Sequence, residues 1–242
     1  FLKELEYALL NNECDIAVHS MKDMPAEMHE NLTISSILER EDCRDVLISK
    51  KYNSLKEFSK GSNIGTSSVR RICNLKHDYP NIKILDMRGN IDTRIKKVLD
   101  GEIDGIILAA AGVKRLGLEK NISEFMDEKI WVPAIGQGAI GIETKKDNKI
   151  INNLVAKLND KKTSLCVKSE RIISEYFEAS CSTPVGANAI IKNNDIHLTA
   201  MIGSLDGKTK IYNQGKGSLK EFKEIALNVA NGIEEKGGRE LL

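Results

Sequence analysis

The sequence predicts an α/β fold followed by a small α+β domain. In the first half, short apolar runs that suit buried strands alternate with segments of helical spacing, which indicates parallel strand pairing. The run at residues 103–109 is almost wholly apolar and is typical of a strand covered on both faces. The last part has strands and then one well-signalled helix, for which Ser218 and Glu221 form a capping box and Gly237 suits the C-cap.

Each expected element follows from apolar periodicity and from turn residues. Helices are predicted over residues 1–10, 53–58, 69–75, 91–99, 149–158, 164–177 and 219–233. Strands are predicted over residues 15–19, 45–49, 63–67, 82–85, 103–109, 187–192, 197–202 and 210–214. Residues 131–143 carry three glycines and a proline within an apolar run, which predicts a hinge that enters a strand.

Composition excludes several classes of protein. The chain has 242 residues, a formal net charge of +1, 41% hydrophobic residues and 29% charged residues. These values suit a globular protein of one to three domains and exclude disorder as the main state. No apolar run approaches the roughly 18–20 residues of a membrane span. The near-neutral charge argues against a general nucleic-acid binder. We therefore expect neither membrane nor nucleic acid as a partner.

The cysteines favour a reducing compartment. They are Cys14, Cys43, Cys73, Cys166 and Cys181. Their number is odd, they form no Cys-x-x-Cys motif, and no histidines lie at zinc-finger spacing. We expect no disulfide scaffold, no bound metal and a cytoplasmic location.

Arginine is unevenly distributed. The chain has 27 lysines but 9 arginines, and five of these arginines lie between residues 65 and 115, namely Arg70, Arg71, Arg88, Arg94 and Arg115. A guanidinium group binds carboxylates or phosphates in bidentate fashion. Residues 65–71 form a strand-to-helix junction, and the other arginines follow the ends of predicted strands, where α/β proteins bind ligands. An anion site and a set of surface ion pairs both remain open from spacing alone.

Two further segments contain candidate catalytic residues. Lys22 and Asp23 are adjacent in a loop after the predicted strand 15–19. Asp23 suits stabilisation of a developing cation or proton transfer, and Lys22 suits an anionic substituent, while a plain turn is the alternative. Cys181 lies in a loop between a predicted helix and strand; a modified or nucleophilic thiol and an inert thiol are both open interpretations.

Together these segments resemble the porphobilinogen deaminase (hydroxymethylbilane synthase) family. The matching strings are VHSMKD (18–23), ERED (39–42), GTSSVRR (65–71), RGN (88–90), TR (93–94), LAAAGVKRLG (108–117), PAIGQGA (133–139), ER (170–171) and the loop around Cys181. They occur in the family's order over nearly the whole chain. A colinear set of this size is highly specific.

The resemblance implies two periplasmic-binding-protein-like lobes, each a sheet flanked by helices, plus a small C-terminal α+β domain. Domain 1 would comprise residues 1–38 and 139–158, with its N-terminal part missing. Domain 2, which binds anions, would comprise residues 44–132, and domain 3, which carries the cysteine, residues 161–242. The chain would cross between the lobes near residues 39–44 and 133–138.

The resemblance also implies a reaction. Members of the family are transferases that join four porphobilinogen molecules head to tail, with loss of ammonia, into hydroxymethylbilane in tetrapyrrole (haem) biosynthesis. The chain grows on a dipyrromethane cofactor held by a thioether, here on Cys181. We expect a cytoplasmic monomer whose partner is its small-molecule substrate.

The residue roles are carried over from the family motifs. Asp23 would be catalytic by stabilising cationic intermediates, which agrees with its chemistry. The expected cofactor-binding residues are Ser20, Lys22, Thr66, Ser67, Ser68, Arg70, Arg71, Arg88, Gly89 and Arg94. The expected substrate-binding residues are Arg88, Arg94, Arg115 and Gln137. Each pyrrole brings two carboxylates, so several guanidinium groups are needed.

One alternative and one departure accompany this interpretation. The two-lobed fold also serves non-catalytic binding modules for small anionic ligands, although such a module has no need of the Cys181 loop or of domain 3. The family's N-terminal segment, with its first strand and a basic, serine-containing stretch, is absent. The sequence also stops short at Leu242. We expect that the sequence is a trimmed form of a longer chain.

Overall fold

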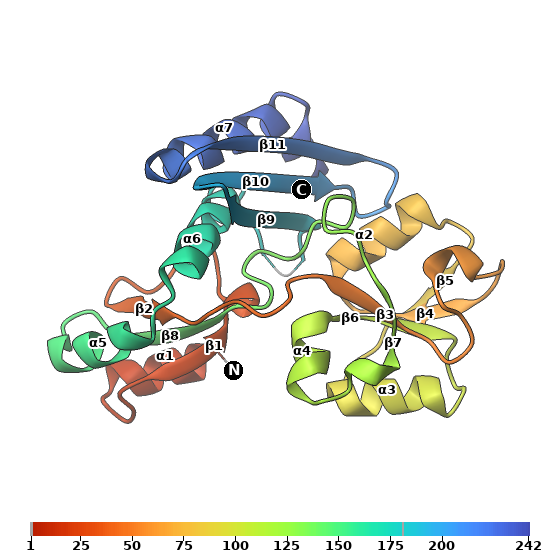
Figure 1. Cartoon of the computed structure of the whole chain (residues 1–242), viewed down its shortest axis with the longest axis horizontal. Helices are drawn as coiled ribbons and strands as arrows, with labels where there is room; N and C mark the ends of the chain where they lie inside the picture. Colours follow the sequence, from red (N-terminus) through yellow and green to blue (C-terminus); the bar gives the residue numbers. More distant parts are fainter. Residues whose placement is uncertain (1, 181) are drawn as a thin grey trace.

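The computed structural model describes residues 2–180 and 182–242. Within these ranges the chain forms three sheets, each with its own helices. Figure 1 shows the first sheet at the left, the second at the right and the third across the top. The predicted class, mixed α/β with helix-flanked sheets and a C-terminal α+β unit, is confirmed. In the described part of the chain, no helix is both long and apolar enough to span a membrane.

The first sheet is built from two distant parts of the chain. Its order is β1-β8-β2 and both pairings are antiparallel. The strands are β1 (Ala17–Ser20), β2 (Leu32–Ile37) and β8 (Ile140–Lys145), and the helices of this region are α1 (Leu2–Leu10) and α5 (Lys149–Val155). Met21 and Ala139 are buried beside Val167, so this sheet shares a core with the helix Lys161–Tyr176 of the C-terminal region.

The second sheet lies between β2 and β8 in the sequence, and its order is β5-β4-β6-β3-β7. The strands are β3 (Asp45–Ile48), β4 (Asn63–Gly65), β5 (Lys83–Leu85), β6 (Gly105–Ala109) and β7 (Ile122–Phe125). The helices are α2 (Val69–Asp78), α3 (Ile91–Leu99) and α4 (Ala110–Arg115). Strand β4 is parallel to β5 and β6, as predicted, but β3 is antiparallel to β6 and β7. The predicted parallel pairing is therefore confirmed for β4 and its two neighbours, and the second sheet as a whole is mixed.

The third sheet is an antiparallel meander with helices on one face. Its strands are β9 (Val185–Lys192), β10 (Asp195–Gly203) and β11 (Lys210–Ser218), and its helices are α6 (Lys161–Tyr176) and α7 (Phe222–Glu234). Ile173, Leu198 and Val229 join sheet and helices in one core. The predicted capping box is not formed, because Ser218 accepts from the Lys220 amide in a 3-10 turn that precedes α7. Gly237 has a φ of +84°, but it shapes the turn after the helix end.

Two irregular segments connect the first two sheets, at residues 38–44 and 132–139. The second segment leads into β8, which confirms the predicted entry into a strand; residues 38–44 and 132–139 together are called the hinge below. The segments touch each other, since the Glu41 amide donates to the Gly138 carbonyl at 3.2 Å. Gly138 has a φ of +88°, and a Cβ there would lie 2.4 Å from the Glu41 carbonyl oxygen. Only glycine therefore fits this crossing.

Candidate active site

A cavity of about 440 Å³ lies where elements of all three sheets meet. It brings together seven of the predicted site residues, Lys22, Asp23, Ser67, Ser68, Arg70, Arg71 and Gln137. Ser180 and Thr183, from the loop after α6, complete its wall. Residues that are far apart in the sequence thus share one recess.

Arg70 and Arg71, at the start of α2, share one buried carboxylate. Arg70 Nη1 lies 2.8 Å from Asp45 Oδ2, and Arg71 Nη2 lies 2.8 Å from Asp45 Oδ1. Burial raises the pKa of Asp45, but the charges of the two arginines outweigh it and hold that pKa well below its usual range. The arginines are therefore buried rather than displayed on the surface.

Asp45 is a site residue that the sequence analysis missed. It is the first residue of β3 and is fully buried (0% exposed). The available signal was a charged residue at the head of the apolar run DVLI, because a charge in such a place is kept only with a partner. The identity of the partners depends on the folded arrangement.

The cavity carries an excess of positive charge. Lys22 lines it together with the two arginines, and Asp23 and the Asp45 carboxylate supply the negative charges. Lys22 keeps contact with solvent, but it faces the recess, where burial and the charge of Arg71 lower its pKa. Three cations against two carboxylates favour an anionic ligand.

Two local features also favour an anionic ligand. The Nε atom of Arg70 is buried and has no hydrogen-bond partner within residues 2–180 and 182–242. Buried polar groups are normally satisfied, so an acceptor on a ligand would complete this arginine. Ser67 and Ser68 precede α2, whose first amides and dipole also favour an anion. The donor set therefore fits a ligand with carboxylate groups.

Asp23 lies in the 3-10 turn Met21–Asp23 that follows β1. Met21 is buried (1% exposed) and anchors the turn, while Asp23 is exposed and lines the cavity. The turn thus places this carboxylate in the same recess as the start of α2. It is free to meet a positive charge on a ligand.

The other predicted residues lie outside the lining of this cavity. Ser20 is half-buried in β1, and Thr66 is buried and accepts from the Ser68 amide at 3.3 Å. The remaining four are on or near α3 and α4, namely Arg88, Gly89, Arg94 and Arg115. Arg88 is close in sequence to the cavity wall, because the Ser67 hydroxyl donates to the carbonyl of the preceding residue, Met87, at 2.7 Å.

These outlying arginines have other partners. Arg88 is highly exposed, and its Nε lies 3.4 Å from Asp86 Oδ2. Among the five clustered arginines, Arg88 therefore forms the kind of surface ion pair that the sequence left open. Arg94 Nε donates to the Gly89 carbonyl at 2.7 Å. Arg115 Nη2 donates to the Gly138 carbonyl at 3.0 Å, which connects α4 to the second crossing segment.

The predicted attachment residue, Cys181, lies outside the described residues. Its neighbours Ser180 and Thr183 line the cavity, and the Ser180 amide donates to Thr183 Oγ1 at 2.8 Å. Burial raises the pKa of the Cys43 thiol to about 11 and that of Cys166 to about 12. Such thiols are poor nucleophiles at neutral pH.

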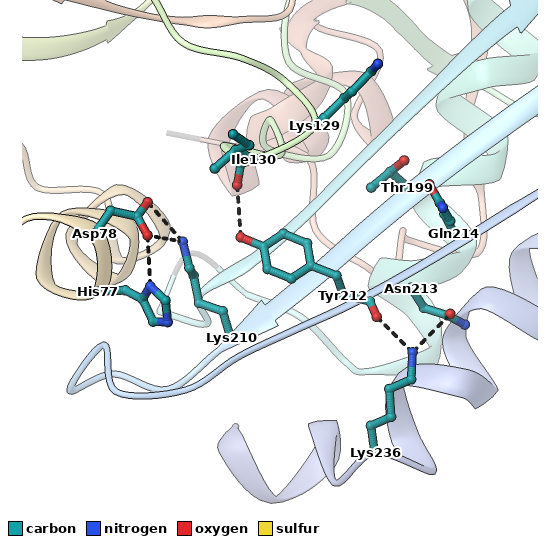
Figure 2. Close-up of a pocket in the computed structure, with 10 residues that line it drawn as sticks. All are labelled: His77, Asp78, Lys129, Ile130, Thr199, Lys210, Tyr212, Asn213, Gln214 and Lys236. Carbon is teal, nitrogen blue, oxygen red and sulfur yellow. Dashed lines mark hydrogen bonds and ion pairs between the residues drawn. The ribbon is translucent and has the colours of Figure 1, made fainter. Parts of the chain in front are cut away.

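A larger cavity, of about 570 Å³, lies between the end of α2 and the third sheet (Figure 2). None of the predicted site residues lines it. Its carboxylate, Asp78, accepts from Lys210 Nζ at 2.8 Å and from Trp131 Nε1 at 3.0 Å. Because Asp78 is already satisfied, we place the functional site in the smaller cavity, where positive charge remains and Asp23 is close.

The fold and this cavity define a class: an α/β protein in which three sheets with their helices surround a cation-lined cavity. Family comparison is more specific. Residues 1–153 match the model "Porphobilinogen deaminase, dipyromethane cofactor binding domain", and residues 164–235 match "Porphobilinogen deaminase, C-terminal domain". The chain belongs to the porphobilinogen deaminase family, the transferases of tetrapyrrole biosynthesis.

Solved structures of other proteins are similar at low identity. The methionine-binding protein MetQ is 15% identical, with a TM-score of 0.44 over 68% of this chain and 76% of that one. A YaeC-family lipoprotein of Enterococcus faecalis V583 is 15% identical, with a TM-score of 0.42 over 69% and 80%. A periplasmic substrate-binding protein of an ABC transporter from Coxiella burnetii is 14% identical, with a TM-score of 0.44 over 65% and 76%. Such low values say nothing about the ligand of this chain.

Proposed function

We propose that the protein is a hydroxymethylbilane synthase. It joins four porphobilinogen molecules head to tail, releases ammonia, and builds on a dipyrromethane primer attached by thioether to Cys181. The family match over residues 1–153 and 164–235 carries the proposal. The cavity supports it, because one recess combines cations for carboxylates with Asp23 and borders the loop that contains Cys181.

The cationic wall would hold the primer. Dipyrromethane carries acetate and propionate arms and, when bound, supplies the pyrrole carbon to which substrate is added. Lys22, Arg70 and Arg71 would bind its carboxylates. The Ser68 hydroxyl would donate a hydrogen bond, and Ser67 would do the same once its hydroxyl turns from the Met87 carbonyl. The unpaired Nε of Arg70 is the donor that most needs such an acceptor. We keep Ser20, Thr66 and Gly89 as further primer-binding residues.

Asp23 would stabilise positive charge. Loss of ammonia from porphobilinogen leaves a cationic pyrrole, and a carboxylate facing its N–H lowers the energy of that species. The exposed side chain of Asp23 in the cavity wall suits this role. The arginines would bind the carboxylates of the pyrroles, and Asp23 would stabilise the cationic pyrrole.

Incoming substrate would be bound by Arg88, Arg94, Arg115 and Gln137. Arg88 and Arg94 follow β5 and would also contact the primer, while Arg115 and Gln137 lie at the second crossing segment. In this proposal domain 1 spans residues 1–38 and 139–158, domain 2 spans residues 44–132, and domain 3 spans residues 161–242. The protein would act as a cytoplasmic monomer.

A stoichiometry measurement tests the reaction. Purified protein is supplied with porphobilinogen, and ammonia and linear tetrapyrrole are quantified together. We expect four molecules of ammonia for each tetrapyrrole released. Binding of porphobilinogen without any release of ammonia would instead support the non-catalytic binding module.

A further inference from the structure

The Asp45 carboxylate is enclosed by donors from two directions. On the α2 side it accepts from Arg70 Nη1 at 2.8 Å and Nη2 at 3.2 Å, and from Arg71 Nη2 at 2.8 Å and Nε at 3.1 Å. On the hinge side it accepts from Gln137 Nε2 at 2.9 Å. One buried carboxylate therefore fixes the direction of two guanidinium groups.

Gln137 connects this cluster to both crossing segments. It lies in the second segment, and its Nε2 also donates to the Cys43 carbonyl of the first segment at 2.6 Å. Its Oε1 accepts from Arg71 Nη2 at 3.4 Å. Arg70 Nη1 in turn donates to the Val132 carbonyl at 2.9 Å, where the second segment begins. The arginines are thus connected to the hinge through Gln137, Asp45 and main-chain carbonyl groups.

We propose that Asp45 is a positioning residue for anion binding, which holds Arg70 and Arg71 at the cavity wall and, through Gln137, connects them to the hinge. Without it two guanidinium groups would be buried side by side, and each would lose its counter-charge. With it they stay charged and oriented, yet one carboxylate for two arginines leaves a net positive charge for a ligand. The identity of the natural ligand rests on the proposed function; the positioning role concerns any carboxylate.

The test separates positioning from general stability. Asp45→Asn is compared with Asp78→Asn, a matched control whose carboxylate also bonds a buried cation, Lys210 (3% exposed), but lies in the other cavity (Figure 2). Affinity for porphobilinogen and for citrate is measured by calorimetry, and the melting temperature is measured for each variant. Citrate is a probe that does not depend on turnover.

We expect Asp45→Asn to weaken binding of both probes by about tenfold or more. Asp78→Asn should lower the melting temperature and leave both affinities at the parent value. If Asp45→Asn binds like the parent, the inference is overturned. Equal loss of affinity in the two variants would also overturn it, because the effect would then be one of stability alone.

A milder variant covers the case in which Asp45→Asn does not fold. Gln137→Met keeps Asp45 and both arginines but removes the hydrogen bonds to Asp45 and to the Cys43 carbonyl and the one accepted from Arg71. It should fold and bind both probes more weakly than the parent, and parent-like affinity would refute the connection to the hinge. If the parent binds the probes but forms no tetrapyrrole, the proposed function is refuted, while the affinities of the variants still test the positioning role of Asp45. A parent that binds neither probe would overturn the inference itself.

Discussion

Arg40 and Glu170 form a two-pronged ion pair between the first crossing segment and α6, with Nη1–Oε1 at 2.5 Å and Nη2–Oε2 at 3.1 Å. Glu170 is fully buried, and it also accepts from the amides of Gly136 and Ala189 at 2.8 and 2.7 Å. One carboxylate therefore contacts both crossing segments and the third sheet.

Glu170→Gln should destabilise the protein by about 3–5 kcal/mol, because it leaves the Arg40 charge buried without its partner. Urea unfolding gives the free energy of unfolding directly. The control is Lys208→Met, which removes an exposed ion pair with Asp206 and should barely move the midpoint. Equal midpoints for the two variants would contradict the role of Glu170.

The two arginines Arg70 and Arg88 should respond differently to replacement by leucine. Sequence clustering alone predicts that both affect elongation more than stability. The structure separates them, since Arg70 is buried against Asp45 and Arg88 is exposed beside Asp86. Arg70→Leu should cost about 3–5 kcal/mol of stability. Arg88→Leu should slow elongation and leave the free energy of unfolding unchanged. If Arg88→Leu also lost much of its stability, the distinction between a buried Arg70 and an exposed Arg88 would be wrong.

We expect ligand binding to depend on pH because of the lowered pKa of Lys22. Burial and Arg71 lower its pKa below 10.5, so the folded protein loses this charge at a lower pH than the unfolded chain does. Carboxylate affinity should fall as the pH rises through that lowered pKa. Stability should rise with pH between the lowered pKa and 10.5, because there the unfolded state binds more protons.

Lys22→Arg is the matching variant, because a guanidinium group stays charged throughout this range. Its affinity for citrate should stay constant from neutral pH to about 10.5, while the affinity of the parent declines. Calorimetry at several pH values checks this. The same alkaline decline in both proteins would assign it to another group.

Asp23 separates catalysis from binding. Asp23→Asn keeps the shape of the side chain but removes its charge, so porphobilinogen should still bind through the arginines. The single-turnover rate should fall by about a hundredfold or more, the usual loss for one preorganised electrostatic group. Asp23→Glu keeps the charge and should retain more activity than Asn. Both variants are first shown to carry primer, and a parent-like rate in Asn would make Asp23 a simple turn residue.

The fold was predictable where local signals are strong. Helix α3 begins and ends at the predicted residues, because its apolar spacing is regular and Asp100 and Gly101 follow it. The strands β2 and β7 and the short helix α4 were missed, since β2 and β7 are part polar and α4 has only six residues, which directly follow the apolar strand β6. Short segments without a clear apolar period do not distinguish a helix from a strand or a loop.

The site was predictable only in part, for a related reason. Lys22, Asp23 and the 65–71 junction are marked by local chemistry at strand ends, and the cavity brings them together. The partner of Arg70 and Arg71 comes from a strand 25 residues earlier in the chain, and Gln137 comes from a second crossing. Sequence spacing carries no information about such contacts. It could not tell a buried cluster from surface ion pairs.

The central claim is a pyrrole primer on Cys181, and the intact mass of the purified protein tests it most directly. The parent should carry the added mass of two linked pyrrole units, located on Cys181 by fragmentation. Cys181→Ser should fold, show the mass of the bare chain and form no tetrapyrrole. Pyrrole on Cys14, Cys43, Cys73 or Cys166 instead, or a bare parent that still makes tetrapyrrole, would contradict the account.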